Sequence, residues 1–185
     1  MKKLLLTIAV VLGLSTTLSA QSPGNIWVGG SVGFNTSKTK NADRLTNYNV
    51  IPEIGYVVSD SWGVGVKLGY AHDEVVRNNH KNKVDGFGVN PFARYTFAKG
   101  DIGGLFVDGG VGYTYSKTKG SDIKNHEIEV GFRPGVAFNV TDNIALTGKF
   151  GFLGYQYDKL GELKTNSFGF DFDLSQIMLG MNIVF

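Results

Sequence analysis

Seven charged residues stand on stretches where apolar and polar side chains alternate, each on the face opposite the apolar ones. They are spread along most of the chain and carry both signs, so that neighbours of opposite charge can pair. Charges enclosed together either form ion pairs or line a water-filled path for ions. The predicted interior charge network consists of Glu53, Lys67, Arg94, Asp108, Glu129, Arg133 and Lys149.

Residues suited to catalysis are few. The three histidines, His72, His80 and His126, fall in or beside predicted loops. His126 adjoins Glu127 and lies near Ser121, but a single loop does not hold a nucleophile, a base and a carboxylate in fixed geometry. No pair of ligands has the spacing of a metal site, and we expect neither a cofactor nor a metal. A lipid-modifying barrel enzyme is therefore only a distant alternative.

The composition favours strands and excludes several classes of protein. The chain has Gly 26, Phe 13 and Tyr 8 in 185 residues and no cysteine, which excludes disulfides, thiol nucleophiles and lipoprotein anchoring. No apolar run after the N-terminus reaches the ~20 residues of a spanning helix. Without Lys2 and Lys3, 18 − 2 = 16 basic residues face 16 acidic ones. A formally neutral chain has no basic stripe for nucleic acid.

The N-terminus has the pattern of a secretory signal peptide. Lys2 and Lys3 precede an apolar run over residues 4–14, and small residues follow up to Ala20. The apolar run is too short to span a membrane comfortably, and cleavage is expected before Gln21. The predicted organisation is a signal peptide over residues 1–20 and one β-barrel domain over residues 21–185.

Eight strand patterns follow in the predicted domain. Short turn-like connections at 59–61, 99–101 and 141–143 alternate with longer polar ones at 36–46, 72–83, 116–125 and 158–166. Short turns at one rim and long loops at the other are typical of outer-membrane barrels. The fold class is all-β, an eight-stranded antiparallel up-and-down transmembrane β-barrel. The predicted strands are 25–35, 47–58, 62–71, 84–98, 103–115, 126–140, 144–156 and 167–185.

The aromatic residues indicate that the apolar face points outward into lipid. They gather at both ends of that face, as in the interfacial girdles of membrane barrels, and the opposite face is rich in glycine, which suits a crowded interior. A periplasmic or secreted ligand-binding barrel, with its apolar face inward, is the alternative. The two predicted girdles are Tyr56, Trp62, Tyr95, Phe97 and Phe138 near the turns and Tyr48, Tyr70, Phe87, Tyr113 and Phe152 near the loops.

Three prolines repeat at one distance from a short turn. Pro52, Pro91 and Pro134 each begin the same alternating pattern of four apolar residues. Proline inside a strand removes a hydrogen bond from the ladder. A shared kink or bulge at this height is the hypothesis.

The signal peptide, the eight strands, the alternating connections and the C-terminal Gly180-Met181-Asn182-Ile183-Val184-Phe185 resemble the OmpA/OmpX-type outer-membrane β-barrel family, within the porin-like superfamily. The resemblance covers the whole predicted domain. It implies the outer membrane of a Gram-negative bacterium, and it implies that the barrel-assembly machinery reads the last strand. The implied assembly signal is Leu179, Met181, Ile183 and Phe185. No peptidoglycan-binding domain is expected.

The expected function is that of an integral outer-membrane barrel with a salt-bridged, largely closed interior, serving envelope structure or surface-loop contacts. A narrow porin-like channel for ions or small solutes is the alternative. Expected partners are outer-membrane lipid and lipopolysaccharide, the latter through loop lysines, and a surface protein ligand that adds a strand at an exposed edge near a predicted bulge at Ser175. The barrel is expected to be a monomer.

Overall fold

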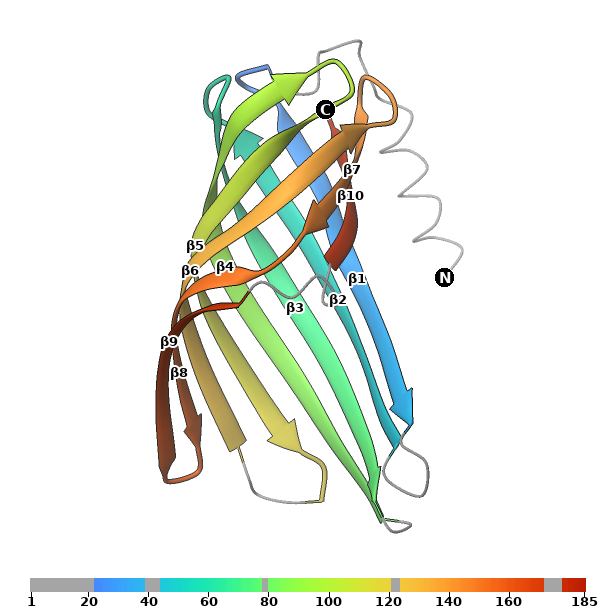
Figure 1. Ribbon diagram of the computed structural model, residues 1–185, viewed down its shortest axis with the longest axis vertical. Coiled ribbons are helices and arrows are strands. Elements are labelled where there is room, and N and C mark those ends of the chain that lie inside the picture. The colour runs from blue at the N-terminus through green and yellow to red at the C-terminus, as the bar shows by residue number, and fades with distance from the viewer. Residues whose placement is uncertain (1–21, 39–43, 78–79, 121–123, 172–177) are drawn as a thin grey trace.

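The computed structural model describes residues 22–38, 44–77, 80–120, 124–171 and 178–185 of the chain. These residues form a tilted ring of antiparallel strands (Figure 1). The predicted signal peptide and Ser175 lie outside the described residues.

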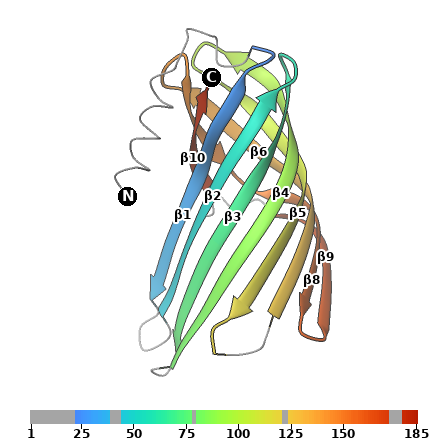
Figure 2. The ribbon, with the colours of Figure 1, turned by 180° about the vertical axis from the view of Figure 1, so that it is seen from behind.

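The ring consists of eight barrel strands, here called staves. Each stave is either one strand or two strand segments that follow one another in the sequence. Each stave pairs antiparallel with its neighbours in sequence, and β1 pairs with β10 to close the ring (Figures 1 and 2). The predicted up-and-down barrel is thus confirmed, but its last two staves are divided, into β7 with β8 and β9 with β10. The strands are β1 (Ile26–Lys38), β2 (Arg44–Val57), β3 (Trp62–Arg77), β4 (His80–Gly100), β5 (Gly103–Thr118), β6 (Lys124–Asn139), β7 (Ile144–Lys149), β8 (Phe152–Leu160), β9 (Leu163–Asp171) and β10 (Met178–Val184).

The strands extend well beyond their predicted ends at one rim. Most of the residues predicted as long loops continue the strands, so that β3 reaches Arg77 and β4 begins at His80. The prediction of long polar loops was therefore wrong for most of those residues, because polar residues in a membrane barrel also occupy strand ends above the lipid. The short connections at the other rim are confirmed.

The three prolines interrupt the ladder toward the following stave. Pairing of β2 with β3 stops at Val50 and resumes at Glu53, and pairing of β4 with β5 skips the two residues 90 and 91 in the same way. Beside Pro134 the partner stave itself breaks between β7 and β8, and the register shifts by one residue. Each ladder breaks because proline has no N–H to donate. A bulge with a change of register thus accompanies only Pro134.

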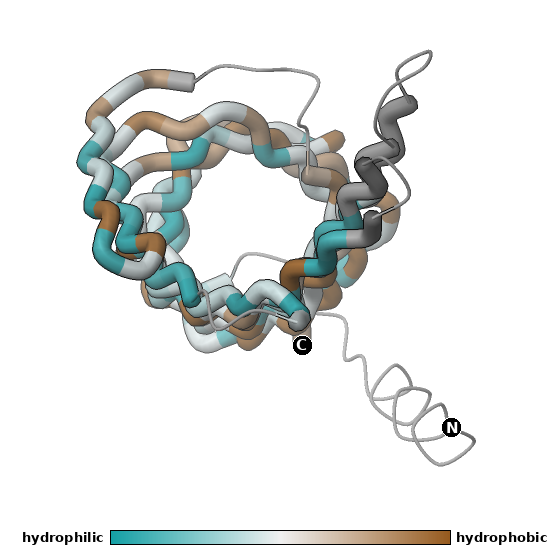
Figure 3. The backbone as a smooth tube through the Cα atoms, turned by 90° about the horizontal axis from the view of Figure 1, so that it is seen from below, coloured by the Kyte–Doolittle hydropathy of each residue, from teal (hydrophilic) through white to brown (hydrophobic). Residues whose placement is uncertain are grey.

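The two faces of the wall differ as the alternation predicts. Outward side chains such as Leu68 are apolar and exposed, whereas Trp27, Phe92 and Val184 are buried inside the ring. Figure 3, a view along the barrel, shows hydropathy alternating along the strands. Phe152 is an exception to the predicted outer girdle. Its ring centroid lies 4.6 Å from the guanidinium carbon of Arg133 inside the ring, because the break before β8 reverses the alternation.

The inward glycines make room for aromatic rings. A Cβ placed on Gly55 would lie 2.1 Å from the Trp27 ring, and one on Gly65 would lie 2.9 Å from the Phe92 ring. A Cβ placed on Gly135 would lie 2.4 Å from the Phe106 ring. Glycine is therefore required at these positions by the packing of the interior.

Among the described residues, the ring is complete only toward the short turns. There β1 pairs with β10 from Trp27 to Val32. Toward the other rim, the described part of the chain gives β9 one partner strand, β8, and gives β1 beyond Val32 one partner strand, β2. The β8–β9 hairpin diverges from β1 in Figures 1 and 2.

Candidate functional site: an ion-pair layer across the lumen

Glu53 is the centre of the interior charges. It lies on β2, where the alternation turns its side chain inward, and it is only 4% exposed. Its Oε1 accepts hydrogen bonds from Arg94 Nη2 on β4 at 3.2 Å, Trp27 Nε1 on β1 at 3.2 Å and Asn182 Nδ2 on β10 at 3.1 Å. Its Oε2 accepts from Lys149 Nζ on β7. Five staves therefore meet at one carboxylate.

Asp108 on β5 is the second buried carboxylate, at 2% exposed. Arg94 donates two hydrogen bonds to it, from Nε to Oδ1 at 2.7 Å and from Nη2 to Oδ2 at 3.0 Å. Lys67 Nζ on β3 donates to Oδ2 at 2.8 Å, and Lys149 Nζ lies 3.6 Å from the same oxygen. Arg94 and Lys149 thus bridge the two carboxylates, and these five charges form one layer.

Aromatic rings enclose the layer. Lys67 Nζ lies 4.1 Å from the Phe92 centroid, and the Arg94 guanidinium carbon lies 4.3 Å from the Phe106 centroid and 5.3 Å from that of Trp27. A desolvated cation on an aromatic face is stabilised by the ring quadrupole. Rings at these positions also exclude water, which strengthens the ion pairs between them.

The remaining two predicted charges form a separate pair. Arg133 Nη2 donates to Glu129 Oε2 at 2.6 Å, and Asn90 Nδ2 donates to Glu129 Oε1 at 3.0 Å. Arg133 stands opposite Asp108 in the pairing of β5 with β6, but among the described residues no side-chain hydrogen bond or ion pair joins this pair to Glu53 or Asp108. The seven predicted residues are therefore brought together as five and two.

The sequence did not predict the neutral members of the site. Trp27, Asn90, Phe92, Phe106 and Asn182 all bind or cover the charges. In the alternating pattern, these residues fall on the same face as the charged ones. That shared face was the one indication in the sequence that they belong to the site. The partner of each one depends on the register between strands, which the sequence pattern does not give.

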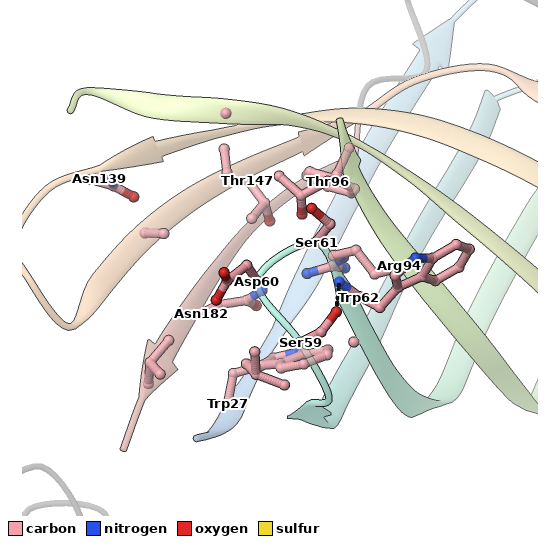
Figure 4. Close-up of a pocket in the computed structure, with 17 residues that line it drawn as sticks. Trp27, Ser59, Asp60, Ser61, Trp62, Arg94, Thr96, Asn139, Thr147 and Asn182 are labelled. Carbon is pink, nitrogen blue, oxygen red and sulfur yellow. Dashed lines mark hydrogen bonds between the residues drawn. The ribbon is translucent and has the colours of Figure 1, made fainter. Parts of the chain in front are cut away.

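A small cavity lies between the charge layer and the short turns. It has a volume of about 80 Å³, and Arg94 and Trp27 are among its lining residues (Figure 4). Ser59, Asp60 and Ser61 of the β2–β3 turn line it as well. Because a water needs roughly 10–15 Å³ of such space, the cavity has room for a few waters.

The histidines with described side chains are engaged outside the lumen. His126 Nδ1 lies 2.8 Å from the Tyr113 hydroxyl on the outer face, while the alternation turns Glu127 inward, so that these two do not form a catalytic pair. Ser121 and the His80 side chain lie outside the described parts. Among the described residues there is no group of three or more His, Asp or Glu side chains that could hold a metal ion.

A polar cluster lies on the outer face, beyond the aromatic residues of the girdle predicted near the loops. His72 Nδ1 lies 2.6 Å from Asp85, and Lys119 Nζ donates to the same carboxylate at 2.8 Å. The hydrogen bonds from Lys119 and His72 hold the pKa of Asp85 well below its usual range, and the pKa of Lys119 is raised by the same pair. Asp85 thus stays ionised at physiological pH.

The C-terminal residues predicted as an assembly signal lie on the closing stave. Leu179 and Met181 on β10 are exposed on the outer face, and Phe185 exchanges two backbone hydrogen bonds with Ile26. This places the last residue at the junction with β1, toward the short turns. Within the described ranges, no helix has the length and apolar character needed to cross a membrane.

Comparisons with known proteins agree with this architecture. The family described as outer membrane protein beta-barrel domain matches residues 6–175. The structure of Neisserial surface protein A is similar with a TM-score of 0.53 at 17% identity, over 86% of this chain and 98% of that one. OprG from Pseudomonas aeruginosa is similar with a TM-score of 0.58 at 12% identity, over 91% and 99%. No curated protein sequence matches the chain. The chain belongs to the outer membrane protein beta-barrel domain family, and its fold is that of an eight-stranded outer-membrane barrel.

Proposed function

We propose that this outer-membrane barrel is closed by its ion-pair layer and serves the envelope as a structural wall that displays its outer rim for surface contacts. The single observation that carries the proposal is the Glu53 carboxylate, which accepts from Arg94, Lys149, Trp27 and Asn182 inside the ring. These donors come from opposite sides of the lumen. An eight-stranded barrel has an interior just wide enough for its own side chains.

The energetics of the layer support a closed state. Each carboxylate is almost fully buried and accepts at least three charged or polar donors. Opening a path would separate buried charges from their partners, which costs several kcal/mol for each uncompensated charge. The aromatic rings of Phe92 and Phe106 fill the space beside the cations, where a conducting path would need water.

Partners and maturation belong to the same proposal. We infer removal of the signal peptide before Gln21, recognition of Leu179, Met181, Ile183 and Phe185 by the barrel-assembly machinery, and no enzyme activity. In the described part of the chain β9 pairs with β8 alone, and a surface protein could add a strand along its other edge.

Planar-bilayer conductance of the folded mature protein tests the closed lumen. The wild-type barrel should show no conductance steps. The variant Lys67→Ser/Arg94→Ser should conduct, because two of the three cations that fill the layer are removed. One cation, Lys149, and two carboxylates then remain, so the open path should favour cations.

A matched control is Glu129→Gln/Arg133→Gln, which neutralises the separate pair and should leave the barrel silent. Heat-dependent gel mobility checks that every variant is folded before it is measured. Conductance steps in the folded wild-type protein would overturn the closed lumen and favour the narrow channel.

A further inference from the structure

Four lysines form a cluster on the outer face at the rim opposite the short turns. The lysine cluster consists of Lys117 on β5, Lys124 on β6, Lys159 on β8 and Lys164 on β9. Lys117 stands directly opposite Lys124, and Lys159 directly opposite Lys164. Lys159 is opposite His126, two residues from Lys124, so that these two lysines are diagonal neighbours. The alternation turns all four outward, as it does Val111 and Val130 on the same strands.

Like charges directly opposite one another destabilise a strand pair. In the described part of the chain no acidic side chain forms an ion pair with any of these four lysines. By contrast, two other lysines of this rim are paired, Lys83 with Glu74 at 3.1 Å and Lys119 with Asp85 at 2.8 Å. Asp85 on β4 stands opposite Lys117 but binds Lys119 and His72 instead. Within the described residues, the cluster therefore carries positive charge that no ion pair neutralises.

An apolar groove lies on the same wall, nearer the middle of the barrel. It has a volume of about 800 Å³ and runs over the outer faces from Trp62 at the start of β3 and from β4 across β5, β6 and β8 to β9. Two small outward residues, Gly109 and Ala93, lie among the lining residues. The Phe132 ring lies over Gly109, where a Cβ would come within 2.9 Å of it, so that this ring forms part of the floor of the groove. Other lining residues are Val111, Tyr155 and Phe168.

The groove and the cluster are arranged along the same strands. The outward residues of β5 are, in order, Gly109, Val111, Tyr113, Tyr115 and Lys117. The first two line the groove, the next two are aromatic, and the last belongs to the lysine cluster. At about 3.4 Å per residue, Lys117 lies roughly 20 Å along the strand from Val111. With a tilt of about 40°, this is roughly 15 Å along the membrane normal, half of a hydrocarbon core of about 30 Å.

We propose that this wall binds the lipid of lipopolysaccharide, a multiply phosphorylated and acylated glycolipid of the outer leaflet, with its phosphates on the lysine cluster and an acyl chain in the groove. The cations match the phosphates, and the apolar hollow lies at a depth that an acyl chain of the same leaflet reaches. A second copy of the chain fits this wall poorly, because a two-fold contact would set one lysine cluster against another. A soluble acidic partner would leave the groove unused. The site is independent of whether the lumen is closed.

The test is a titration of the folded mature barrel in neutral detergent with bisphosphorylated lipid A, followed by native mass spectrometry. Because each lysine near an anionic lipid surface strengthens binding by about fivefold, Lys124→Gln/Lys159→Gln should weaken binding about 30-fold. The matched control Lys83→Gln/Lys99→Gln removes the same charge outside the cluster and should change affinity by less than about threefold. Lys99, Lys124 and Lys159 are exposed, and Lys83 is half-buried beside Glu74 at the rim. The heat-dependent gel mobility of both variants should therefore stay that of the wild type.

Two further arms separate the sources of binding. The same lipid without its phosphates should bind the wild-type barrel about as weakly as bisphosphorylated lipid A binds Lys124→Gln/Lys159→Gln. Inorganic pyrophosphate, which has no acyl chain, should not compete at the concentration of the lipid. Equal affinity of both variants, full binding of the dephosphorylated lipid, competition by pyrophosphate, or a lysine-dependent dimer in the mass spectrum would each overturn the proposal.

Discussion

At the scale of single residues, the alternation of the sequence was enough to find the buried charges and not enough to find their partners. Glu53 and Asp108 could be predicted because each is the one acid on the inward face of its stretch. That Trp27 and Asn182 bind Glu53 depends on the register of β1 and β10, which places Gly29 opposite both Glu53 and Asn182. Register is set by the whole ring, so no local pattern could supply it.

The glycines next to inward rings lead to a prediction at the same scale. Gly55→Ala should lower the free energy of unfolding by about 1–3 kcal/mol, because its Cβ would lie 2.1 Å from the buried Trp27 ring and force it to move. Urea unfolding of the barrel in lipid vesicles measures the change.

The matched control is Gly69→Ala on the next strand, whose Cβ would have no heavy atom closer than 3.9 Å. It should leave the unfolding free energy almost unchanged. If both substitutions cost the same, the glycines serve backbone flexibility and not the packing of Trp27.

At the scale of elements, the sequence predicted the number of staves and their direction but not the break between β7 and β8. The bulge predicted near Ser175 falls between β9 and β10, outside the described residues. Pro134 was visible, but the break occurs on its neighbour, between β7 and β8, where Phe150 N donates to the Pro134 carbonyl. The consequence for a side chain was also missed, since Phe152 turns inward. A proline in one strand thus changed which side chains of the next strand point inward. The pattern of a single strand cannot show this, because it does not depend on the neighbouring strand.

The edge of β9 gives a prediction for the elements. Within the described ranges β9 pairs with β8 alone, whereas β5 pairs with both β4 and β6. Backbone amides on the unpaired side of β9 should exchange hydrogen with solvent at least about tenfold faster than those of β5. Hydrogen–deuterium exchange of the barrel in lipid nanodiscs measures both.

Equal protection of β9 and β5 would show that β9 is paired on both edges in the membrane. A ligand protein that adds a strand should slow exchange in β9 and leave β5 unchanged.

At the scale of the whole molecule, the interior layer joins staves that are far apart in the sequence. Lys149 and Asn182 stand 96 and 129 residues from Glu53, and both bind it next to the junction where β10 closes on β1. The charges therefore do more than fill the lumen, because they tie the first staves to the last across the closure. The family match shows the barrel, and the contacts of this chain show how its ends are held.

Neutralising that one carboxylate should consequently weaken the entire barrel. Glu53→Gln leaves Lys149 and Arg94 with Asp108 as their one remaining carboxylate in the layer, and breaking a buried ion pair by removing one partner costs about 3–5 kcal/mol. Urea unfolding in vesicles should show a loss of that size in one cooperative transition. Glu129→Gln, which affects the contacts with Arg133 and Asn90 but none in the layer, should cost clearly less. Similar losses from both would mean that Glu53 stabilises its immediate surroundings alone and that the closure of the ring does not depend on it.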